Sequence, residues 1–575
     1  MSKTVAEVIV DAIAAAGVER VYGVAGDSLN GITNSIYKHK NMRWVHVRHE
    51  ETAAFAAGAE AQLTGNLTVC AGSCGPGNLH LINGLYDCHR SRVPVLAIAA
   101  QIPSSELGSN YFQETHPEYL FKECSHYCEL VSSASQIPRI VEIAIQTALS
   151  RRGVAVIVVP GDIALHQAVH DELRIASYRH SNPSIRPGDE LLHELAKVLN
   201  ESKKVTILGG AGCAGAHNEL VALAAALKAP IVHAMRGKEH IEYDNPYDVG
   251  MTGLLGFSSG YYAMKECDTL LMLGTDFPYQ QFYPERAKIV QIDNRPEQIG
   301  RRTHVDLGVT GNIKETITAL LPLLQEKTEA RHLEQSQQNY REARKGLDDL
   351  ATGTPGSNLI HPQFLAKELD LAAADDAIFT VDVGTPVIWA ARYLHMNGKR
   401  RIIGSFNHGS MANALPQAIG AAMTHPDRQV ITLSGDGGFA MLMGDLLTLR
   451  QLNLPVKIVI FDNSSLGFVE MEMKATGFLD HDVALINPDF AKVAEGAGIL
   501  GVRCESPEQV RPALEKVLAH KGPALLDVRV NRQELAMPPS LQLNQIVDFN
   551  LYMVKAILNG RGDEVLDLAR TNLFR

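Results

Sequence analysis

Short runs of apolar residues alternate with longer amphipathic segments in three blocks of the chain. The runs include NLTVCAG, VPVLAIAA and VAVIVVPGD in the first block, KVTILGGAG and TLLMLGTD in the second, and AIFTVDVG, RQVITLSGDG and PVKIVIFDN in the third. Uninterrupted apolar strands between helices are typical of parallel sheets that are covered on both faces. The pattern therefore predicts an α/β fold with three doubly wound parallel-sheet domains.

Two polar passages separate the blocks and place the domain boundaries. The second passage is strongly charged, and it predicts a helix followed by a connector rich in Gly, Pro and Ser. We expect domains over residues 1–182, 183–340 and 341–530, followed by a C-terminal amphipathic tail over 531–575. A chain of 575 residues is too long for one hydrophobic core, which agrees with this division.

Composition and charge narrow the classes of function. The 53 basic and 64 acidic residues give a net charge of −11, which argues against nucleic acid as a partner. Glu7 and Asp11 interrupt the first apolar stretch, so it predicts an amphipathic helix rather than a signal peptide. We expect the eight cysteines to be reduced and mostly buried, with zinc binding by two Cys-x3-Cys pairs as the less favoured alternative.

A Gly-Asp-Gly turn and an Asp-Asn turn end two successive strands of the third block. Gly435-Asp436-Gly437 and Asp462-Asn463 are separated by residues 438–461, enough for one helix and the second strand. Such a βαβ unit brings both turns to the same edge of a sheet. A carboxylate and an amide oxygen beside glycines suit Mg²⁺ that holds a diphosphate, whereas two ordinary strand-end turns are the structural alternative.

This segment resembles the fingerprint of the thiamine-diphosphate enzymes, and the likeness extends along the whole chain. It implies that Asp436, Asn463 and the Ser465 carbonyl bind Mg²⁺, while Asp462 replaces a family Asn that is not a ligand. It also implies that the three domains bind, in order, the coenzyme pyrimidine, FAD and the coenzyme diphosphate. The likeness places thiamine diphosphate against Gly409, Ser410, Met411, Asp436, Gly437, Gly438, Asn463, Ser464, Ser465, Leu466, Gly467, Phe468 and Val469.

Glu50 begins a helix of small residues after the strand MRWVHV. Taken alone, it is most simply an acid that interacts favourably with the dipole of its helix. Thiamine diphosphate, however, needs a carboxylate near N1′ of its pyrimidine, because that hydrogen bond favours the imino tautomer that deprotonates thiazolium C2. The family supplies this acid from the first domain across a subunit interface, and the resemblance assigns it to Glu50 rather than Glu51.

The middle block carries a glycine-rich turn, Gly210-Ala211-Gly212-Cys213-Ala214-Gly215, that would suit NAD. The acid expected after the next strand is missing, and Met235-Arg236-Gly237-Lys238 stands there instead. Family oxidases bind FAD in such a domain, and an empty, degenerate domain is the alternative. The resemblance assigns FAD to Met251, Thr252, Gly253, Leu254, Gly274, Thr275, Asp276, Phe277, Pro278, Ile292 and Asp293. Of these, Asp293 could bond a ribose hydroxyl.

Within the family, strings such as AGSCGPGNLHLINGL and GSNYFQETHP resemble the quinone-dependent pyruvate oxidases. That likeness implies that a homotetramer oxidises pyruvate to acetate and CO₂ and passes electrons through FAD to ubiquinone. Phe112 and Gln113 are expected to line the substrate pocket, and Phe468 and Glu472 to lie near the reacting carbon. Core packing is the alternative for the two phenylalanines. An acetohydroxyacid synthase with structural FAD, an oxygen-dependent pyruvate oxidase and a non-catalytic nucleotide-binding protein are the rival functions.

The last residues of the chain predict a short amphipathic helix, with Val565, Leu566, Ala569 and Leu573 on one face. Such a helix commonly docks on its own protein. The resemblance instead implies a regulatory tail that binds membrane phospholipid. We therefore expect a cytoplasmic enzyme that associates peripherally with the inner face of the cell membrane.

Overall fold

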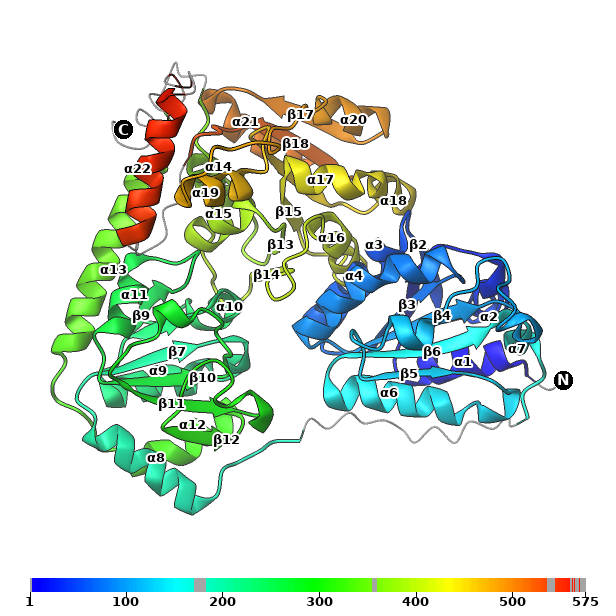
Figure 1. The fold of residues 1–575 in the computed structure, drawn as a ribbon, viewed down its shortest axis with the longest axis horizontal. Helices are drawn as coiled ribbons and strands as arrows, with labels where there is room; N and C mark the ends of the chain where they lie inside the picture. The colour runs from blue at the N-terminus through cyan, green and yellow to red at the C-terminus, as the bar shows by residue number, and fades with distance from the viewer. Residues whose placement is uncertain are drawn as a thin grey trace.

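The computed structural model describes residues 3–169, 183–353, 359–534 and 543–558, together with residues 561, 563 and 568. It contains three six-stranded sheets in which every strand pair is parallel. Figure 1 shows one sheet in each of three domains, coloured blue to cyan, green, and yellow to orange along the chain. The predicted α/β fold class is confirmed.

The first domain contains a sheet of strand order β2-β1-β3-β4-β6-β5. Its strands are β1 (Arg20–Gly23), β2 (Arg43–His46), β3 (Thr68–Gly72), β4 (Val95–Gln101), β5 (Tyr127–Leu130) and β6 (Val154–Pro160). Its helices are α1 (Val5–Ala15), α2 (Asn30–Lys38), α3 (Glu50–Thr64), α4 (Pro76–Ser91), α5 (Pro117–Leu120), α6 (Arg139–Arg151) and α7 (Gly161–Leu165). The central strands β3, β4 and β6 are buried throughout, which explains their uninterrupted apolar sequences.

The middle domain has the strand order β12-β11-β10-β7-β8-β9. Its strands are β7 (Val205–Gly209), β8 (Ile231–His233), β9 (Asp248–Met251), β10 (Thr269–Leu273), β11 (Lys288–Asp293) and β12 (Leu307–Thr310). Its helices are α8 (Asp189–Glu201), α9 (His217–Leu227), α10 (Lys238–Ile241), α11 (Ser258–Lys265), α12 (Ile313–Leu320) and α13 (Arg331–Leu350). Numbered within the domain, this is the order 3-2-1-4-5-6 of dinucleotide-binding folds, which reverses between β7 and β10.

The third domain repeats the strand order of the first, as β14-β13-β15-β16-β18-β17. Its strands are β13 (Ile378–Val381), β14 (Arg401–Gly404), β15 (Val430–Gly435), β16 (Lys457–Asp462), β17 (Leu500–Cys504) and β18 (Ala524–Arg529). Its helices are α14 (Pro362–Ala372), α15 (Thr385–Tyr393), α16 (Ala414–Thr424), α17 (Asp436–Leu442), α18 (Leu446–Leu452), α19 (Gly467–Ala475), α20 (Phe490–Gly496) and α21 (Pro507–Ala519). The predicted boundary at residue 340 lies inside α13.

The first and third domains pack through α3 and α16. A Cβ atom at Gly420 would lie 2.1 Å from the carbonyl oxygen of Ala56, so the two helix backbones are in direct contact. Beside them, the buried Asp445 accepts hydrogen bonds from Thr52 Oγ1 at 2.6 Å and from the Arg48 backbone at 2.9 Å. These two domains therefore share one continuous hydrophobic core.

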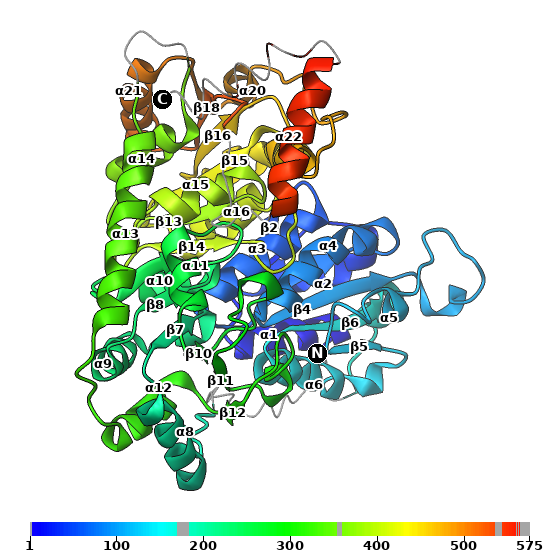
Figure 2. The same ribbon diagram turned by 60° about the vertical axis from the view of Figure 1, so that its left-hand side comes forward.

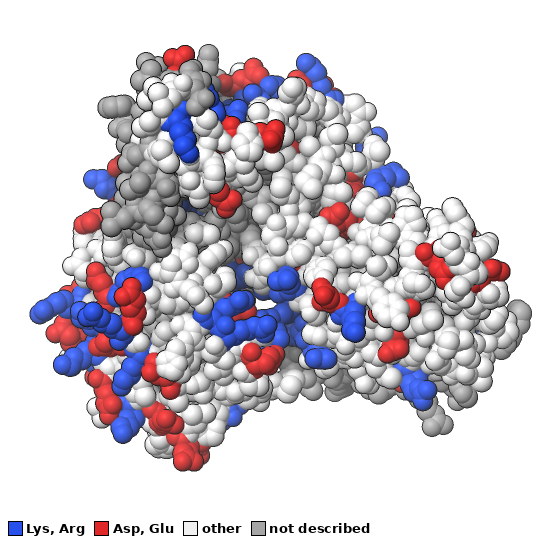
Figure 3. Space-filling model, viewed as in Figure 1, with Lys and Arg blue, Asp and Glu red and all other residues white. Residues whose placement is uncertain are grey.

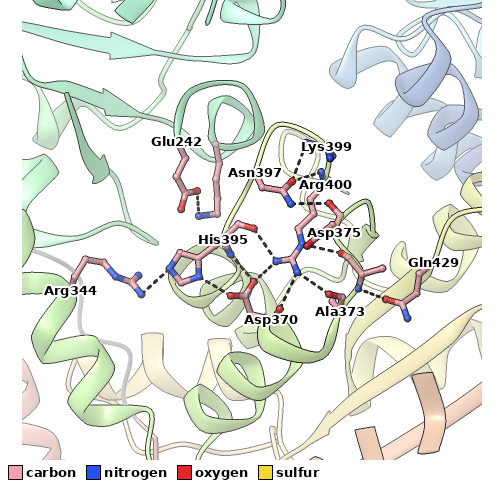
Figure 4. A network of polar contacts seen from close by, with 12 residues as sticks. Glu242, Arg344, Asp370, Ala373, Asp375, His395, Asn397, Lys399, Arg400 and Gln429 are labelled. Carbon is pink, nitrogen blue, oxygen red and sulfur yellow. Dashed lines mark hydrogen bonds and ion pairs between the residues drawn. The ribbon is translucent and has the colours of Figure 1, made fainter. Parts of the chain in front are cut away.

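Within the third domain, Arg400 ties the end of α14 to the start of β14. Its guanidinium donates to Asp370 Oδ1 at 2.7 Å and to four backbone carbonyls, those of Asp370, Ala373, Ala374 and His395 (Figure 4). Asp370 also accepts a hydrogen bond from the ring of His395 at 2.7 Å. Every donor of this buried cation thus has an acceptor.

The last described helix, α22 (Leu543–Leu558), lies beside α19 of the third domain (Figure 1). Tyr552 and Ala556 are buried, and Lys555 Nζ donates to the Gly477 carbonyl at 2.7 Å. The opposite face exposes Leu551, Val554, Ile557 and Leu558. Val565, Leu566, Ala569 and Leu573 lie outside the described residues. Within the described part of the chain, we find no helix long and apolar enough to cross a membrane.

Candidate functional site

A cavity of about 1380 Å³ lies where the three domains meet. The carboxyl ends of the middle and third sheets face it, and residues from the end of α4 and from α6 close its remaining side. Figure 3 shows a hollow at the centre of this face of the molecule, with basic side chains around it. Carboxyl-terminal strand ends are where open parallel sheets bind their ligands.

Most of the predicted site residues line this cavity. From the third domain they are Gly409, Met411, Asp436, Gly437, Gly438, Ser465, Leu466, Gly467, Phe468, Val469 and Glu472. From the middle domain they are Met251, Thr252, Gly253, Leu254, Gly274, Thr275, Asp276, Phe277, Pro278 and Asp293. The residues absent from its lining are Glu50, Phe112, Gln113, Ile292, Ser410, Asn463 and Ser464.

Asp436 stands at the carboxyl end of β15, buried beside the end of β16. Its carboxylate accepts a hydrogen bond from Asn487 Nδ2 at 2.7 Å, and the same nitrogen donates to Asp462 at 2.9 Å. Burial, reinforced by the negative charge of Asp462, raises the pKa of Asp436 to about 7. A cation at this position would offset that unfavourable burial of charge, and oxygen ligands of this kind suit Mg²⁺.

Asp462 forms an ion pair in addition to its hydrogen bond with Asn487, and its expected role outside the metal site stays a prediction. It is fully buried and pairs with Arg529 at 2.7 Å. Asn463, one of the predicted ligands, faces its own turn, because its Oδ1 accepts a hydrogen bond from the Ser465 backbone at 3.0 Å. Binding of Mg²⁺ by Asn463 and the Ser465 carbonyl therefore stays a prediction.

The turn that follows β15 comes unusually close to β13. A Cβ atom at Gly438 would lie 2.2 Å from Asp382 Oδ2, so no larger residue fits there. Asp382 is buried, its Oδ2 has no hydrogen-bond partner among the described residues, and burial raises its pKa to about 7. Asp436, Gly437 and Gly438 also line the cavity, so the backbone of this turn can contact a ligand group such as a diphosphate there.

The segment before α16 presents its backbone to the cavity. Gly409 has φ of +81°, and a Cβ atom there would meet no other atom within 4 Å. Met411 lies over the neighbouring turn, with its methyl carbon 3.6 Å from the Cβ position of Gly437. These positions suit contact with the coenzyme, which the resemblance expects of both residues.

Two first-domain residues on α4 hold this segment in place, and the sequence analysis missed both. The buried Asp87 accepts a hydrogen bond from Ser405 Oγ at 2.8 Å, and Ser405 Oγ accepts one from the Ser410 backbone at 3.0 Å. Asn83 Nδ2 donates to Ser410 Oγ at 2.8 Å. No local sequence motif indicates a contact between residues more than three hundred positions apart. These two contacts could therefore not be predicted from the sequence.

Glu50 lies in the first turn of α3, and its side chain is buried. Its carboxylate lies 2.9 Å from Nδ1 of His80 on α4. Glu50 does not line the cavity of its own chain. Its action on a coenzyme held by a second copy of the chain therefore remains a prediction.

Phe112 and Gln113 occupy a loop that also lies away from this cavity. Phe112 is 79% exposed, so core packing does not explain it. Gln113 adopts a left-handed backbone conformation, and its Oε1 accepts a hydrogen bond from Cys74 Sγ at 3.4 Å. Phe468 and Glu472 do line the cavity, and Phe468 also packs against the third-domain core.

The glycine turns of the middle domain meet where its strand order reverses. A Cβ atom at Gly212, after β7, would lie 2.6 Å from the Cα of Gly274, after β10. The turns are therefore in backbone contact at the edge of the cavity. Asp293 is buried at the end of β11, and its Oδ1 accepts a hydrogen bond from the Arg295 backbone at 2.9 Å. The strand order of the middle domain and its glycine turns together suit the binding of a dinucleotide.

A glycine-flanked acidic turn of the third sheet and glycine turns of the middle sheet border one cavity, an arrangement typical of α/β enzymes that work with organic cofactors. Family models of the thiamine pyrophosphate enzymes match the chain three times. The N-terminal TPP binding domain matches residues 3–120, the central domain 192–320 and the C-terminal TPP binding domain 382–528. The chain belongs to this family of thiamine-diphosphate-dependent decarboxylases and oxidases.

Three relatives illustrate the breadth of the likeness. The chain is 36% identical to the putative thiamine pyrophosphate-containing protein YdaP of Bacillus subtilis, over 99% of both chains. It is 30% identical to a pyruvate oxidase of Lactiplantibacillus plantarum, over 90% of this chain and 87% of that one. It is also 30% identical to an acetolactate synthase of Arthrospira platensis, over 92% and 94% respectively.

Proposed function

We propose that the protein oxidatively decarboxylates pyruvate to acetate and CO₂ and passes two electrons through FAD to a membrane quinone. Pyruvate, water and quinone are consumed, and acetate, CO₂ and quinol are formed. One observation carries the proposal: the Asp436 turn and the Gly274 turn open into the same cavity. A decarboxylating centre and an electron acceptor can therefore share one enclosed space.

The third domain supplies the residues that would hold the coenzyme. Asp436, Asn463 and the Ser465 carbonyl would bind Mg²⁺, and the backbone of Gly437 and Gly438, which line the cavity, would contact the diphosphate. Thiamine diphosphate supplies the carbon nucleophile and electron sink that loss of CO₂ requires. Phe468, which lines the same cavity, would exclude water from the reacting carbon, which favours loss of a carboxylate.

A second copy of the chain would complete the site. Glu50 is absent from the cavity of its own chain, and the aromatic ring of Phe112 is exposed. Both observations fit an assembly in which the first domain of one copy covers the third domain of another. We propose a homotetramer in which Glu50, Phe112 and Gln113 act across such an interface.

The decisive experiment adds pyruvate to the full-length protein without oxygen and follows the absorbance of bound flavin. With thiamine diphosphate and Mg²⁺ present, we expect the flavin to bleach and a quinone to restore its colour. Glu50→Gln should abolish bleaching, whereas Glu51→Gln on the same helical turn should not. Acetate should be the product.

The two rival reactions predict different products. The 30% identity to acetolactate synthases favours a carboligase as the second candidate. Acetolactate formed without flavin bleaching would establish that activity instead. Acetyl phosphate formed with hydrogen peroxide would indicate an oxygen-dependent pyruvate oxidase. The name of another relative, a pyruvate oxidase, makes pyruvate oxidation of either kind a reasonable candidate.

We further propose that the C-terminal tail binds membrane phospholipid, which would bring a cytoplasmic enzyme to ubiquinone at the inner face of the membrane. The exposed apolar side chains of α22 support this, because they lie on one face of a docked helix. Deletion of residues 553–575 should abolish activation by phospholipid vesicles but preserve turnover with a soluble electron acceptor. Unchanged vesicle binding would refute the role of the tail.

A further inference from the structure

The end of the cavity between the first and middle domains is rich in arginine. The basic residues that line the cavity are Arg92, His126, Arg151, Arg152, Arg236, His240, Arg295 and Arg401. Burial and the neighbouring positive charges of His89, Arg151 and Arg295 lower the pKa of His126 to about 4. The acidic residues Glu239, Asp276, Asp293 and Glu297 line the cavity as well, so an anion would bind where a guanidinium group is not paired with one of them.

Arg236 is the member of this group that lies next to the glycine turn after β7 in the middle domain. It follows β8, within the turn η5 (Met235–Gly237), and is largely buried. Its Nη2 donates to the Ser91 carbonyl at 3.1 Å, but no carboxylate of the described residues lies within ion-pair distance. Burial and the nearby charge of Arg92 lower its pKa, although the charges of Asp87, Asp276 and Glu239 oppose this shift from beyond ion-pair distance. A guanidinium without a directly paired carboxylate keeps donors for an anionic ligand, which would complete its compensation.

Arg92 reaches the same place from the first domain. It ends α4 in a left-handed conformation, and its Nη2 lies 3.1 Å from Asp276 Oδ2. Asp276 is shared with Arg302, whose guanidinium lies 3.8 Å from the same oxygen. One carboxylate thus serves two guanidinium groups, and among the described residues Arg236 has no carboxylate within ion-pair distance.

The arginines border the glycine turns that suit a dinucleotide. A Cβ atom at Gly237, next to Arg236, would lie 2.8 Å from the Gly209 carbonyl and 3.2 Å from the Cα of Gly210. Asp276, the partner of Arg92, follows Gly274 by two residues. Both guanidinium groups are therefore held next to the turns after β7 and β10, where a nucleotide diphosphate lies in folds of this strand order.

We propose that Arg236 and Arg92 bind the phosphate groups of the FAD dinucleotide, so that the first domain holds the cofactor of the middle domain. This inference rests on the FAD assignment in the proposed function and adds the recognition of its phosphates. Guanidinium groups donate paired hydrogen bonds that match phosphate oxygens. It also gives a role to the arginine that stands where an NAD-binding domain carries an acid.

The test measures the affinity of the full-length protein for three flavins, from the quenching of flavin fluorescence. FAD carries two phosphates, FMN one and riboflavin none. Arg236→Gln should weaken FAD binding by about 10- to 100-fold, because a charge-assisted hydrogen bond is lost. Arg92→Gln should act in the same direction, and Arg236→Lys should lie between Arg236→Gln and the unchanged protein. Arg139→Gln, on the exposed start of α6, is the matched control and should bind FAD normally.

Riboflavin separates phosphate recognition from a merely structural role. Its affinity should be the same in Arg236→Gln as in the control, because it has no phosphate to lose. Equal weakening of riboflavin and FAD would overturn the proposal, as would normal FAD affinity in both Arg236→Gln and Arg92→Gln. NADPH binding that depends on Arg236 while FAD binding does not would assign the arginine to another nucleotide and overturn it too. If Arg236→Gln does not fold, Arg236→Lys and Arg92→Gln carry the test.

Bleaching of the flavin by pyruvate is measured in the same preparations, and its outcome does not depend on the outcome of the affinity measurements. If pyruvate bleaches the flavin but substitution of either arginine leaves the FAD affinity unchanged, the phosphate assignment is overturned and the proposed function stays intact. FAD affinity that depends on Arg236, without bleaching, would overturn the proposed function alone. An unchanged protein that binds no flavin would overturn both.

Discussion

The side-chain nitrogen of Asn487 lies 2.7 Å from a carboxylate oxygen of Asp436. Since it also donates to Asp462, it separates two buried acids that would otherwise repel each other. Asn487→Asp replaces this donor with a third negative charge. Without divalent cations, we expect the melting temperature of the variant to fall by several degrees.

Magnesium should reverse much of that loss. Mg²⁺ with thiamine diphosphate should raise the melting temperature of Asn487→Asp more than that of the unchanged protein, because it neutralises more charge. Scanning fluorimetry with the cofactors and with EDTA measures both values. Asn41→Asp, at an exposed turn, is the control. Equal stabilisation of all three proteins by Mg²⁺ and thiamine diphosphate would mean that the cation does not bind beside Asp436.

Gly438 and Gly444 offer a matched pair of alanine substitutions. An added Cβ at Gly438 would lie 2.2 Å from Asp382, whereas one at Gly444 would meet no atom within 4 Å. Gly438→Ala must shift the turn that faces the diphosphate, so we expect it to lose detectable thiamine diphosphate binding. Gly444→Ala should bind normally. Calorimetric titration in the presence of Mg²⁺ checks both, and normal binding by Gly438→Ala would exclude this turn from the diphosphate site.

Asp248, at the start of β9, should make stability depend on pH. Burial, and next the charge of Glu242, raise its pKa from 3.8 to about 8. The folded chain therefore retains a proton that the unfolded chain releases, and this stabilisation is fully present below pH 3.8 and is lost as pH rises through about 8. Asp248→Asn should show a melting temperature that falls less over this interval.

Thermal melts across that interval test the prediction. The exposed Asp244, close by in the chain, provides the control substitution Asp244→Asn. If the melting temperatures of Asp248→Asn and of the unchanged protein change with pH in parallel, burial does not raise the pKa of Asp248 as we expect.

Loss of one partner from the buried ion pair of Asp370 and Arg400 should strongly destabilise the fold. Asp370→Ala leaves the buried guanidinium without its counter-ion, which costs about 3–5 kcal/mol and lowers the melting temperature on the order of 10 °C. Burial acts to raise the pKa of Asp370, but His395 and Arg400 outweigh it and lower the pKa, so acid should also break the pair. Arg511→Ala, in an exposed pair with Glu368, should change the melting temperature little.

Glu114 should position the loop that carries Phe112 and Gln113. Its carboxylate accepts hydrogen bonds from the backbones of Gly108 at 2.5 Å and Tyr111 at 3.1 Å. Figure 2 shows the segment between β4 and α5 standing out from the first domain. Glu114→Gln loses one acceptor, so we expect the KM for pyruvate to rise on the order of tenfold. The content of bound flavin should not change.

The neighbouring acid Glu106, in the same segment, is the control for this substitution. Glu106→Gln should leave the KM for pyruvate unchanged, since its carboxylate makes no hydrogen bond to the loop backbone among the described contacts. A fall in kcat with an unchanged KM in Glu114→Gln would contradict a positioning role for substrate binding.

Local pattern was enough to predict the fold class and the cavity-lining turns. Buried strands are continuous apolar runs, and the glycines and Asp436 follow their ends directly in the chain. The charged segment predicted as a helix is indeed α13, although its extent was not read from the sequence, because only Leu333 and Ser336 on it are buried.

Contacts between distant parts of the chain had no such signal. Asn487 reaches Asp436 from a segment without a motif, and Arg92 meets Asp276 from 184 residues away. The strand order shared by the first and third sheets also depends on long-range pairing, which periodicity does not reveal. Sequence reasoning therefore found the turns but not the residues that orient them.

The cavity draws its lining from residues as far apart in the chain as Gln62 and Glu472. During synthesis the N-terminal domain emerges and folds first, long before the third domain exists. Coenzyme can therefore be captured only by a nearly finished chain, and a ligand stabilises only the state that binds it. A truncated product could contain a well-folded first domain, yet no supply of the vitamin would protect it from proteolysis.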